Sequence, residues 1–232
     1  MDTLALVTPM RLSLSLSVAA FAWGTWRALT PAADPPDSPA RGAPEAWHRR
    51  LGLRLLGLFA LAELVTQQGL VARLPRVFQL GMALAMGVTL ASVAGPEARA
   101  RFDAMPAERE RGLLGFRMVF GAFLYAAAFS GVLPPRFGLL AGTGDLLVGW
   151  LAWALPETRR ARLAIHVVGL VDLASVLAGV ALDVLPWVAR HAEVRPAVSL
   201  PWVAVPLMLA INLHGIRRGL AVAAARPTAA RA

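Results

Sequence analysis

The chain of 232 residues contains no cysteine and no lysine, and it has a single tyrosine, Tyr125. The absence of cysteine excludes disulfides, thiolate zinc sites and cysteine nucleophiles. The absence of lysine excludes a retinal Schiff base and other lysine-based covalent chemistry. All 23 basic residues are therefore arginine, which is consistent with a bias in composition. We predict no cofactor.

Sequence motifs of known catalysts are absent as well. The stretch Gly142-Thr143-Gly144-Asp145 lacks the lysine and the preceding strand of a phosphate-binding loop. Neither Ser92 nor Ser130 lies in the glycine-flanked turn of a serine hydrolase. No His-Glu spacing typical of zinc sites is present. We expect a non-enzymatic protein without catalytic residues and without a metal site.

Long apolar blocks are the main feature of what is present, since 57% of the residues are hydrophobic and the mean hydropathy is +0.60. A helix that crosses a bilayer needs about 20 apolar residues, with a range of roughly 17 to 25. The blocks predict an all-α, polytopic membrane helix bundle, with residues 1–232 as a single integral membrane domain. Seven spans are expected, at Leu12–Leu29, Leu51–Leu70, Val77–Ala94, Leu113–Leu133, Phe137–Leu155, Leu163–Leu185 and Leu200–Ile216.

The first block has a second interpretation. The stretch from Leu12 to Ala22 follows Arg11 and ends in a small-residue pattern, as in a cleaved signal peptide, and this would leave six spans. Trp23 and Trp26 favour a retained helix, because tryptophan anchors spans at the membrane interface.

The arginines between the blocks indicate the orientation. Fifteen lie in the segments after the first, third, fifth and seventh blocks, and six lie on the opposite side. The positive-inside rule then places the N-terminus outside and the C-terminus in the cytoplasm of a bacterial inner membrane. The Pro-rich loop 31–50 and the Arg-rich tail 217–232 would be cytoplasmic. The formal charge of +9 does not indicate nucleic acid, since the arginines form no single face or tail.

Asp145 is the only charged residue between Phe137 and Leu155. A lone carboxylate in a membrane span is costly and is usually functional. At about 100° per residue it shares a helix face with small residues, namely Gly138, Ala141, Gly149 and Ala152. Such a face suits close helix packing or a polar cavity.

Other polar residues within the predicted spans complete the candidate site. Either the acids converge in the bundle and bind a proton or a ligand, or each hydrogen-bonds separately to a neighbouring helix. His166 lies about 120° around its helix from Asp172, so the two share no face. His214 is expected at the cytoplasmic interface. The candidate ligand-binding or proton-binding residues are Glu63, Asp145, Asp172, Tyr125, His166 and His214.

Two local features of the sequence lead to further predictions. The mixed charges between Gly95 and Arg111 predict a short surface helix. Pro201 and Pro206 are expected to loosen the start of the last span, because proline removes a backbone donor.

The cytoplasmic arginines allow contact with an acidic cytoplasmic protein, or they serve only to set the topology. The lipid bilayer is the other expected partner. The candidate contact residues are Arg49, Arg50, Arg99, Arg101, Arg109, Arg111, Arg217 and Arg218.

Leu133-Pro134, Phe137, Ala141-Gly142, Gly144-Asp145 and Val148-Gly149, followed by Gly169 and Asp172, resemble a pattern of uncharacterised multi-pass bacterial membrane proteins. The resemblance covers the fourth to sixth predicted spans and implies a family fold without a known activity. In size, arginine-only basic residues and multi-pass layout, the chain is also similar to the myxobacterial membrane anti-sigma factors of light-induced carotenoid synthesis. It lacks the zinc-type His and Cys pattern of many anti-sigma domains.

Three functions follow from the sequence. The first is a membrane regulator or sensor that sequesters a cytoplasmic partner such as a sigma factor, in agreement with the missing catalytic motifs. The second is a small-solute or proton-coupled transporter that uses the buried acids. The third is an intramembrane lipid-modifying enzyme with carboxylates and histidines around a metal.

Overall fold

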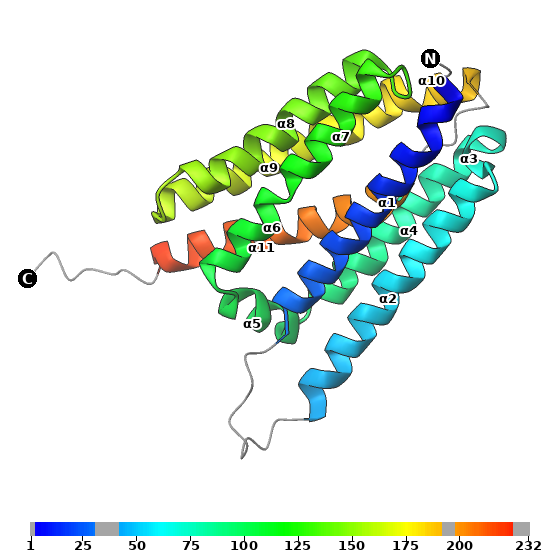
Figure 1. Ribbon diagram of the computed structural model, residues 1–232. Coiled ribbons are helices and arrows are strands. Elements are labelled where there is room, and N and C mark those ends of the chain that lie inside the picture. The colour runs from blue at the N-terminus through cyan, green and yellow to red at the C-terminus, as the bar shows by residue number, and fades with distance from the viewer. Residues whose placement is uncertain (1–2, 31–41, 192–197, 225–232) are drawn as a thin grey trace, which may run out of the picture.

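The computed structural model describes residues 3–30, 42–191 and 198–224, and within these ranges every regular element is a helix (Figure 1). The stretches 31–41 and 225–232, which belong to the predicted Pro-rich loop and tail, lie outside the described residues. The elements are α1 (Thr3–Ala28), α2 (Gly42–Gln67), α3 (Leu70–Arg73), α4 (Pro75–Val93), α5 (Pro96–Ala104), α6 (Ala107–Gly115), α7 (Arg117–Phe129), α8 (Pro135–Ala154), α9 (Arg159–Gly179), η1 (Val180–Val184), α10 (Leu185–Arg190), η2 (Leu200–Ala204) and α11 (Val205–Ala224).

Five helical segments of the described chain are long and apolar enough to cross a membrane. They coincide with the third to seventh predicted spans, with boundaries that shift by several residues, and confirm that these blocks form helices of sufficient length and hydropathy. Three of them join adjacent elements, since α6 continues into α7, α9 continues through η1 into α10, and η2 continues into α11. The segments are Arg76–Val93, Ala107–Phe129, Pro135–Ala154, Arg159–Arg190 and Leu200–Ala221.

The first two predicted spans also form helices, α1 and α2, each of 26 residues. Neither is among the five apolar segments. For α2 the reason is composition, because Arg49, Arg50 and Arg54 lie along it. The lengths of α1 and α2 agree with the prediction.

The helices form one bundle, in which α8 packs against both α7 and α9, and α9 packs against α11 (Figure 1). On the other side, α1 and α4 pack against α2, and η2 contacts α1, α2 and α4. Helix α3, α10 and the start of α1 lie at one end, which we call the α3 end (Figure 1). Helix α5 and the end of α11 lie toward the opposite end, which we call the α5 end (Figure 1).

Glycines let α7 and α8 approach at backbone distance. A Cβ atom at Gly121 would lie 2.7 Å from the carbonyl oxygen of Gly142, and one at Gly138 would lie 2.8 Å from the carbonyl oxygen of Leu124. The predicted small-residue face of α8, including Asp145, is buried. This confirms close packing of that face and places Asp145 against α7.

We expect Gly121→Val to destabilise the protein by about 1 to 3 kcal/mol, because the added side chain overlaps the α8 backbone, which cannot move independently. The control is Gly87→Ala, since a Cβ there meets nothing within 4 Å. It should be neutral or slightly stabilising, because alanine favours helix. Denaturant unfolding in mild detergent measures both, and equal effects of the two changes would contradict the packing argument.

The predicted surface helix at Gly95–Arg111 is wrong in its second half. Helix α5 ends at Ala104, and α6 begins at Ala107 and continues into α7 within one candidate span. Glu110, assigned to the surface from its charged neighbours, is 6% exposed. Its burial is possible because cationic side chains from other helices surround its carboxylate.

Two short π-helical segments, η1 and η2, interrupt the last long helices. Pro201 lies within η2, and Pro206 follows it, so the expected loosening at the start of the last span is confirmed. Pro186 follows η1 in the same way. Such π-helical turns within α-helices are frequent at functional sites.

Candidate functional site

Arg117 lies at the centre of the bundle with no exposed surface, between two carboxylates from other helices. Its Nε donates to Asp145 Oδ1 of α8 at 2.7 Å, and its Nη2 donates to Asp172 Oδ2 of α9. Gly144 makes room for this contact, because a Cβ there would overlap Asp172 Oδ1. We call Arg117, Asp145 and Asp172 the ion-pair cluster, and it joins α7, α8 and α9.

The ion-pair cluster is not neutral, since two carboxylates face one guanidinium and leave a formal excess of one negative charge. Asp145 and Asp172 are 6% and 7% exposed, so water screens this charge little. The Nη1 atom of Arg117 is buried without a hydrogen-bond partner among the described residues. An unbalanced buried charge favours the binding of a proton or a cation.

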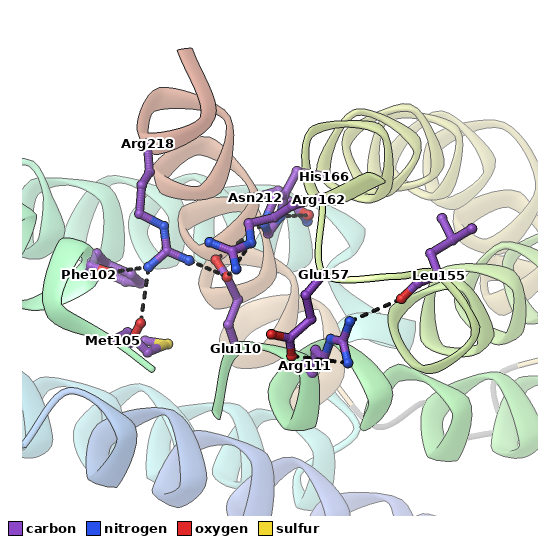
Figure 2. A network of polar contacts seen from close by, with 10 residues as sticks. All are labelled: Phe102, Met105, Glu110, Arg111, Leu155, Glu157, Arg162, His166, Asn212 and Arg218. Atoms are coloured by element: carbon purple, nitrogen blue, oxygen red, sulfur yellow. Dashed lines mark hydrogen bonds and ion pairs between the residues drawn. The ribbon is translucent and has the colours of Figure 1, made fainter. Parts of the chain in front are cut away.

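A second group of charges surrounds Glu110 at the start of α6 (Figure 2). Arg218 Nη2 donates to Glu110 Oε2, and Arg162 Nε lies 3.7 Å from the same oxygen. His166 Nε2 lies 3.2 Å from Oε1 of the same carboxylate. We call Glu110, Arg162, His166 and Arg218 the Glu110 cluster. Within the cluster, two guanidinium groups face one carboxylate.

The Glu110 cluster also holds α5. Arg218 Nη1 donates to the carbonyl oxygens of Phe102 and Met105 at 3.2 and 3.1 Å (Figure 2). Arg111 Nη2 donates to the carbonyl oxygen of Leu155, and its Nη1 lies 3.2 Å from Glu157 Oε1, so α6 is tied to the turn between α8 and α9 (Figure 2). Arg218 therefore connects α5 to the Glu110 cluster, and Arg111 connects α6 to the turn between α8 and α9.

Asn212 on α11 links the two clusters. Its Nδ2 donates to the carbonyl oxygen of Met208 at 2.9 Å, so its Oδ1 accepts from Nδ1 of His166 at 3.1 Å. A Cβ at Gly169 would lie 2.6 Å from Asn212 Oδ1 and 3.1 Å from Arg117 Nη1, so the amide and the guanidinium lie beside the same glycine. Polar side chains thus follow one another from Asp145 to Glu110.

An apolar cavity of about 120 Å³ lies on the other side of Asp145. Side chains from α1, α4, α7, α8, α9, η1, η2 and α11 line it, and Asp145 and Arg11 are the ionisable residues among them. Val180 of η1 and Leu200 of η2 contribute to the wall, so both π-helical segments border the cavity. The carboxylate of Asp145 is shared between the cavity and the ion-pair cluster.

Three of the predicted site residues meet in this network, namely Asp145, Asp172 and His166, and three contact other groups. Glu63 Oε1 accepts from the hydroxyl of Ser15 on α1 at 2.7 Å. The Tyr125 hydroxyl lies 2.6 Å from Thr143 Oγ1 and thus contacts no acid there. His214 Nε2 lies 3.0 Å from the carbonyl oxygen of Val93, and its ring stacks on Phe102.

The arginines predicted to contact a partner divide into two groups. Arg49, Arg50, Arg99 and Arg109 are exposed. The others contact the chain itself: Arg101 donates to the carbonyl oxygen of Leu29 and lies over the Trp47 ring, Arg217 pairs with Asp103 at 2.5 Å, and Arg111 and Arg218 bind as described above.

Arg117, Glu110, Arg162 and Asn212 are site residues outside the set predicted from the sequence. Arg117 lies within the predicted span Leu113–Leu133, and Glu110 lies within the predicted surface helix. A lone arginine inside an apolar block is itself a signal, because a buried guanidinium requires acids as partners. Within the described residues, no three His, Cys, Asp or Glu side chains are grouped closely enough to hold a metal ion.

The fold and the site define an all-α chain with several helices long and apolar enough to cross a membrane, built around a buried Asp–Arg–Asp cluster. Residues 77–218 match the family described as domain of unknown function DUF8737, and the chain belongs to this family. No curated protein and no solved structure matches the chain. The matched range contains both charge clusters.

Proposed function

We propose that this protein is a non-enzymatic, multi-pass sensor in a bacterial inner membrane. The sensor binds one proton at the ion-pair cluster, and the resulting change in helix packing reaches its cytoplasmic face. Seven spans are proposed, with α1 and α2 in addition to the five apolar segments. The N-terminus is then outside, and the α5 end is cytoplasmic. The distribution of arginine supports this orientation.

The observation that carries the proposal is the pair of carboxylates on one buried guanidinium. A proton on Asp145 or Asp172 removes the excess charge and weakens one of the two ion pairs with Arg117. Because these pairs join α7, α8 and α9, protonation changes the forces between three helices. The negative excess lies at the ion-pair cluster, where the proton binds.

The Glu110 cluster supports the second part of the proposal. Arg218 bonds both to Glu110 and to carbonyl oxygens at the end of α5 and just beyond it, so movement of α6 or α11 reaches this segment. The exposed arginines Arg49, Arg50, Arg99 and Arg109 provide a basic surface at the same end for an acidic cytoplasmic partner. Such a sensor holds or releases its partner according to the state of the bundle.

We expect a pH step to change two signals that Asp145→Asn and Asp172→Asn each abolish. The first is the infrared C=O band of a protonated buried carboxylic acid. The second is the emission of an environment-sensitive fluorophore on Ala100→Cys, an exposed position on α5 in a chain without other cysteines. The signals arise together because one proton changes the ion pairs that position the helices.

The control for this experiment is Glu63→Gln, which removes an acid that contacts Ser15 instead of Arg117. It should leave both signals intact. A carboxylic acid band that persists in both Asn variants, or that disappears in Glu63→Gln, would refute the proposed proton site. An infrared change without a change at position 100 would refute the coupling to α5 and leave the proton site in place.

A further inference from the structure

We propose that the groove between α1 and α2 binds one anionic phospholipid, with the phosphate at Arg49 and one acyl chain along the groove. The proposal rests on the proposed orientation, in which α1 and α2 are spans and the α5 end is cytoplasmic, and it does not depend on the proton site. The groove has a volume of about 580 Å³, which lies within the roughly 300 to 1,000 Å³ of ligand sites.

The head of the groove lies at the α5 end. The end of α1 and the start of α2 both lie toward this end (Figure 1). Arg101 of α5 donates to the carbonyl oxygen of Leu29, and its guanidinium lies 5.2 Å over the ring of Trp47 on α2. From Arg49 to Phe59, the groove follows α2 for about 15 Å at 1.5 Å per residue. This is about half of the hydrocarbon core of a bilayer, so the groove spans one leaflet.

Aromatic side chains form the head of the groove and fix its shape. The rings of Trp23 and Trp26 lie 4.7 Å apart, and His48 stacks on Trp26 at 4.2 Å. The Nε1 atom of Trp26 donates to the carbonyl oxygen of His48 at 3.0 Å, which holds α1 against α2. Tryptophan side chains prefer the level of the lipid head groups. The lipid phosphates are therefore expected beside Trp23, Trp26 and Arg49.

Arg49 supplies the anion-binding group. It is exposed in the groove and, within the described part of the chain, forms no hydrogen bond or ion pair. Arg50 does not line the groove, and its Nε donates to the carbonyl oxygen of Ala46 at 3.2 Å. The described lining residues include no acid that would compete for Arg49. A guanidinium binds phosphate oxygens through parallel N–H donors, so Arg49 suits a lipid head group.

The charge of Arg49 decides between lipid classes. The apolar wall does not, because lipid chains are as apolar in the bilayer as in the groove. A zwitterionic head group carries its own cation beside the phosphate, whereas an anionic one leaves the phosphate charge to Arg49. Basic sites between spans on the cytoplasmic side bind anionic lipids in this way. Leu53 and Leu56 are exposed, so the groove is open at its side and the second acyl chain lies in the bilayer.

The test uses the purified full-length chain in detergent and native mass spectrometry, with phosphatidylglycerol and phosphatidylcholine of identical acyl chains as the probes. We expect phosphatidylglycerol to bind about fivefold more tightly, the effect typical of one arginine at a membrane surface. Arg49→Gln should weaken phosphatidylglycerol to the level of phosphatidylcholine. Ala19→Phe should weaken both lipids, because it fills the groove.

The matched controls are Arg50→Gln and Ala20→Phe, two exposed neighbours that do not line the groove. Both should keep the affinity and the preference of the unchanged protein. Equal binding of the two lipids by the unchanged protein would overturn the proposal even if the variants failed to fold. Equal losses in Arg50→Gln and Arg49→Gln, or full binding in Ala19→Phe, would overturn it as well. The infrared band of the proton site is measured separately, so failure of one proposal leaves the other standing.

Discussion

Replacement of Arg117 by methionine should destabilise the protein by about 3 to 5 kcal/mol, the cost typical of removing one partner from a buried ion pair. The change leaves Asp145 and Asp172 facing each other's charge with no cation between them. Methionine is apolar, unbranched and similar in length, so packing is disturbed less than charge. Thermal unfolding in mild detergent, followed by size-exclusion chromatography, measures the loss of folded protein.

The decisive comparison is a triple variant, Arg117→Met with Asp145→Asn and Asp172→Asn. Removing all three charges together should restore most of the stability, because buried ion pairs replaced by neutral groups are often neutral or stabilising. A matched single control is Arg54→Gln, an exposed arginine that bonds Ser92 on α4 and contacts no acid there. If the triple variant were as unstable as Arg117→Met, uncompensated charge would not be the cause of the instability. The cause would then be the loss of the packing that the arginine side chain provides.

The ion-pair cluster also shows which part of the site a single sequence can predict. Asp145 was identified because a carboxylate in an apolar block is conspicuous, and its small-residue face predicted close packing. That face does pack on α7. The partner of Asp145 could not be identified in this way, because helix periodicity describes one helix and does not tell which neighbour it faces.

Helix continuity explains why Arg117 and Glu110 were placed wrongly. The hydropathy of residues 95–111 is low, so the predicted span began at Leu113 and left Arg117 close to its end. In the structure α6 and α7 run through Ala107–Phe129, and Arg117 lies near the middle. Charged residues of α6 lower its hydropathy, and the partners of the buried Glu110 lie on α9 and α11. Tertiary ion pairs are not visible in local composition.

Glu63 illustrates the opposite outcome. It shares the features that marked Asp145, since it is an acid within an apolar block with small and polar neighbours. Its contact is nevertheless a single serine hydroxyl on α1. Glu63 and Asp145 differ in the helix that packs against each of them. Both predicted arrangements of the acids, convergence in the bundle and separate hydrogen bonding, are therefore found in one chain.

Removal of the Glu110 carboxylate is the other change from which we expect a large effect. Glu110→Ala should destabilise the protein by about 2 to 3 kcal/mol, since His166, Arg162 and Arg218 lose their shared counter-ion. The cost is lower than for Arg117, because Arg162 and Arg218 retain 32% and 15% of their side-chain exposure and so keep part of their hydration.

The part of the protein that loosens in Glu110→Ala should be more informative than the total loss of stability. Arg218 holds the carbonyl oxygens of Phe102 and Met105, and Glu110 positions Arg218. Backbone amides of α5 should therefore exchange hydrogen faster in Glu110→Ala, while those of α8 keep their protection. The matched control is Glu108→Ala, an exposed acid on the same helix. Faster exchange of α5 in both variants would indicate a general effect of charge at α6. Faster exchange in Glu110→Ala alone would assign the connection between the buried charges and α5 to this one carboxylate.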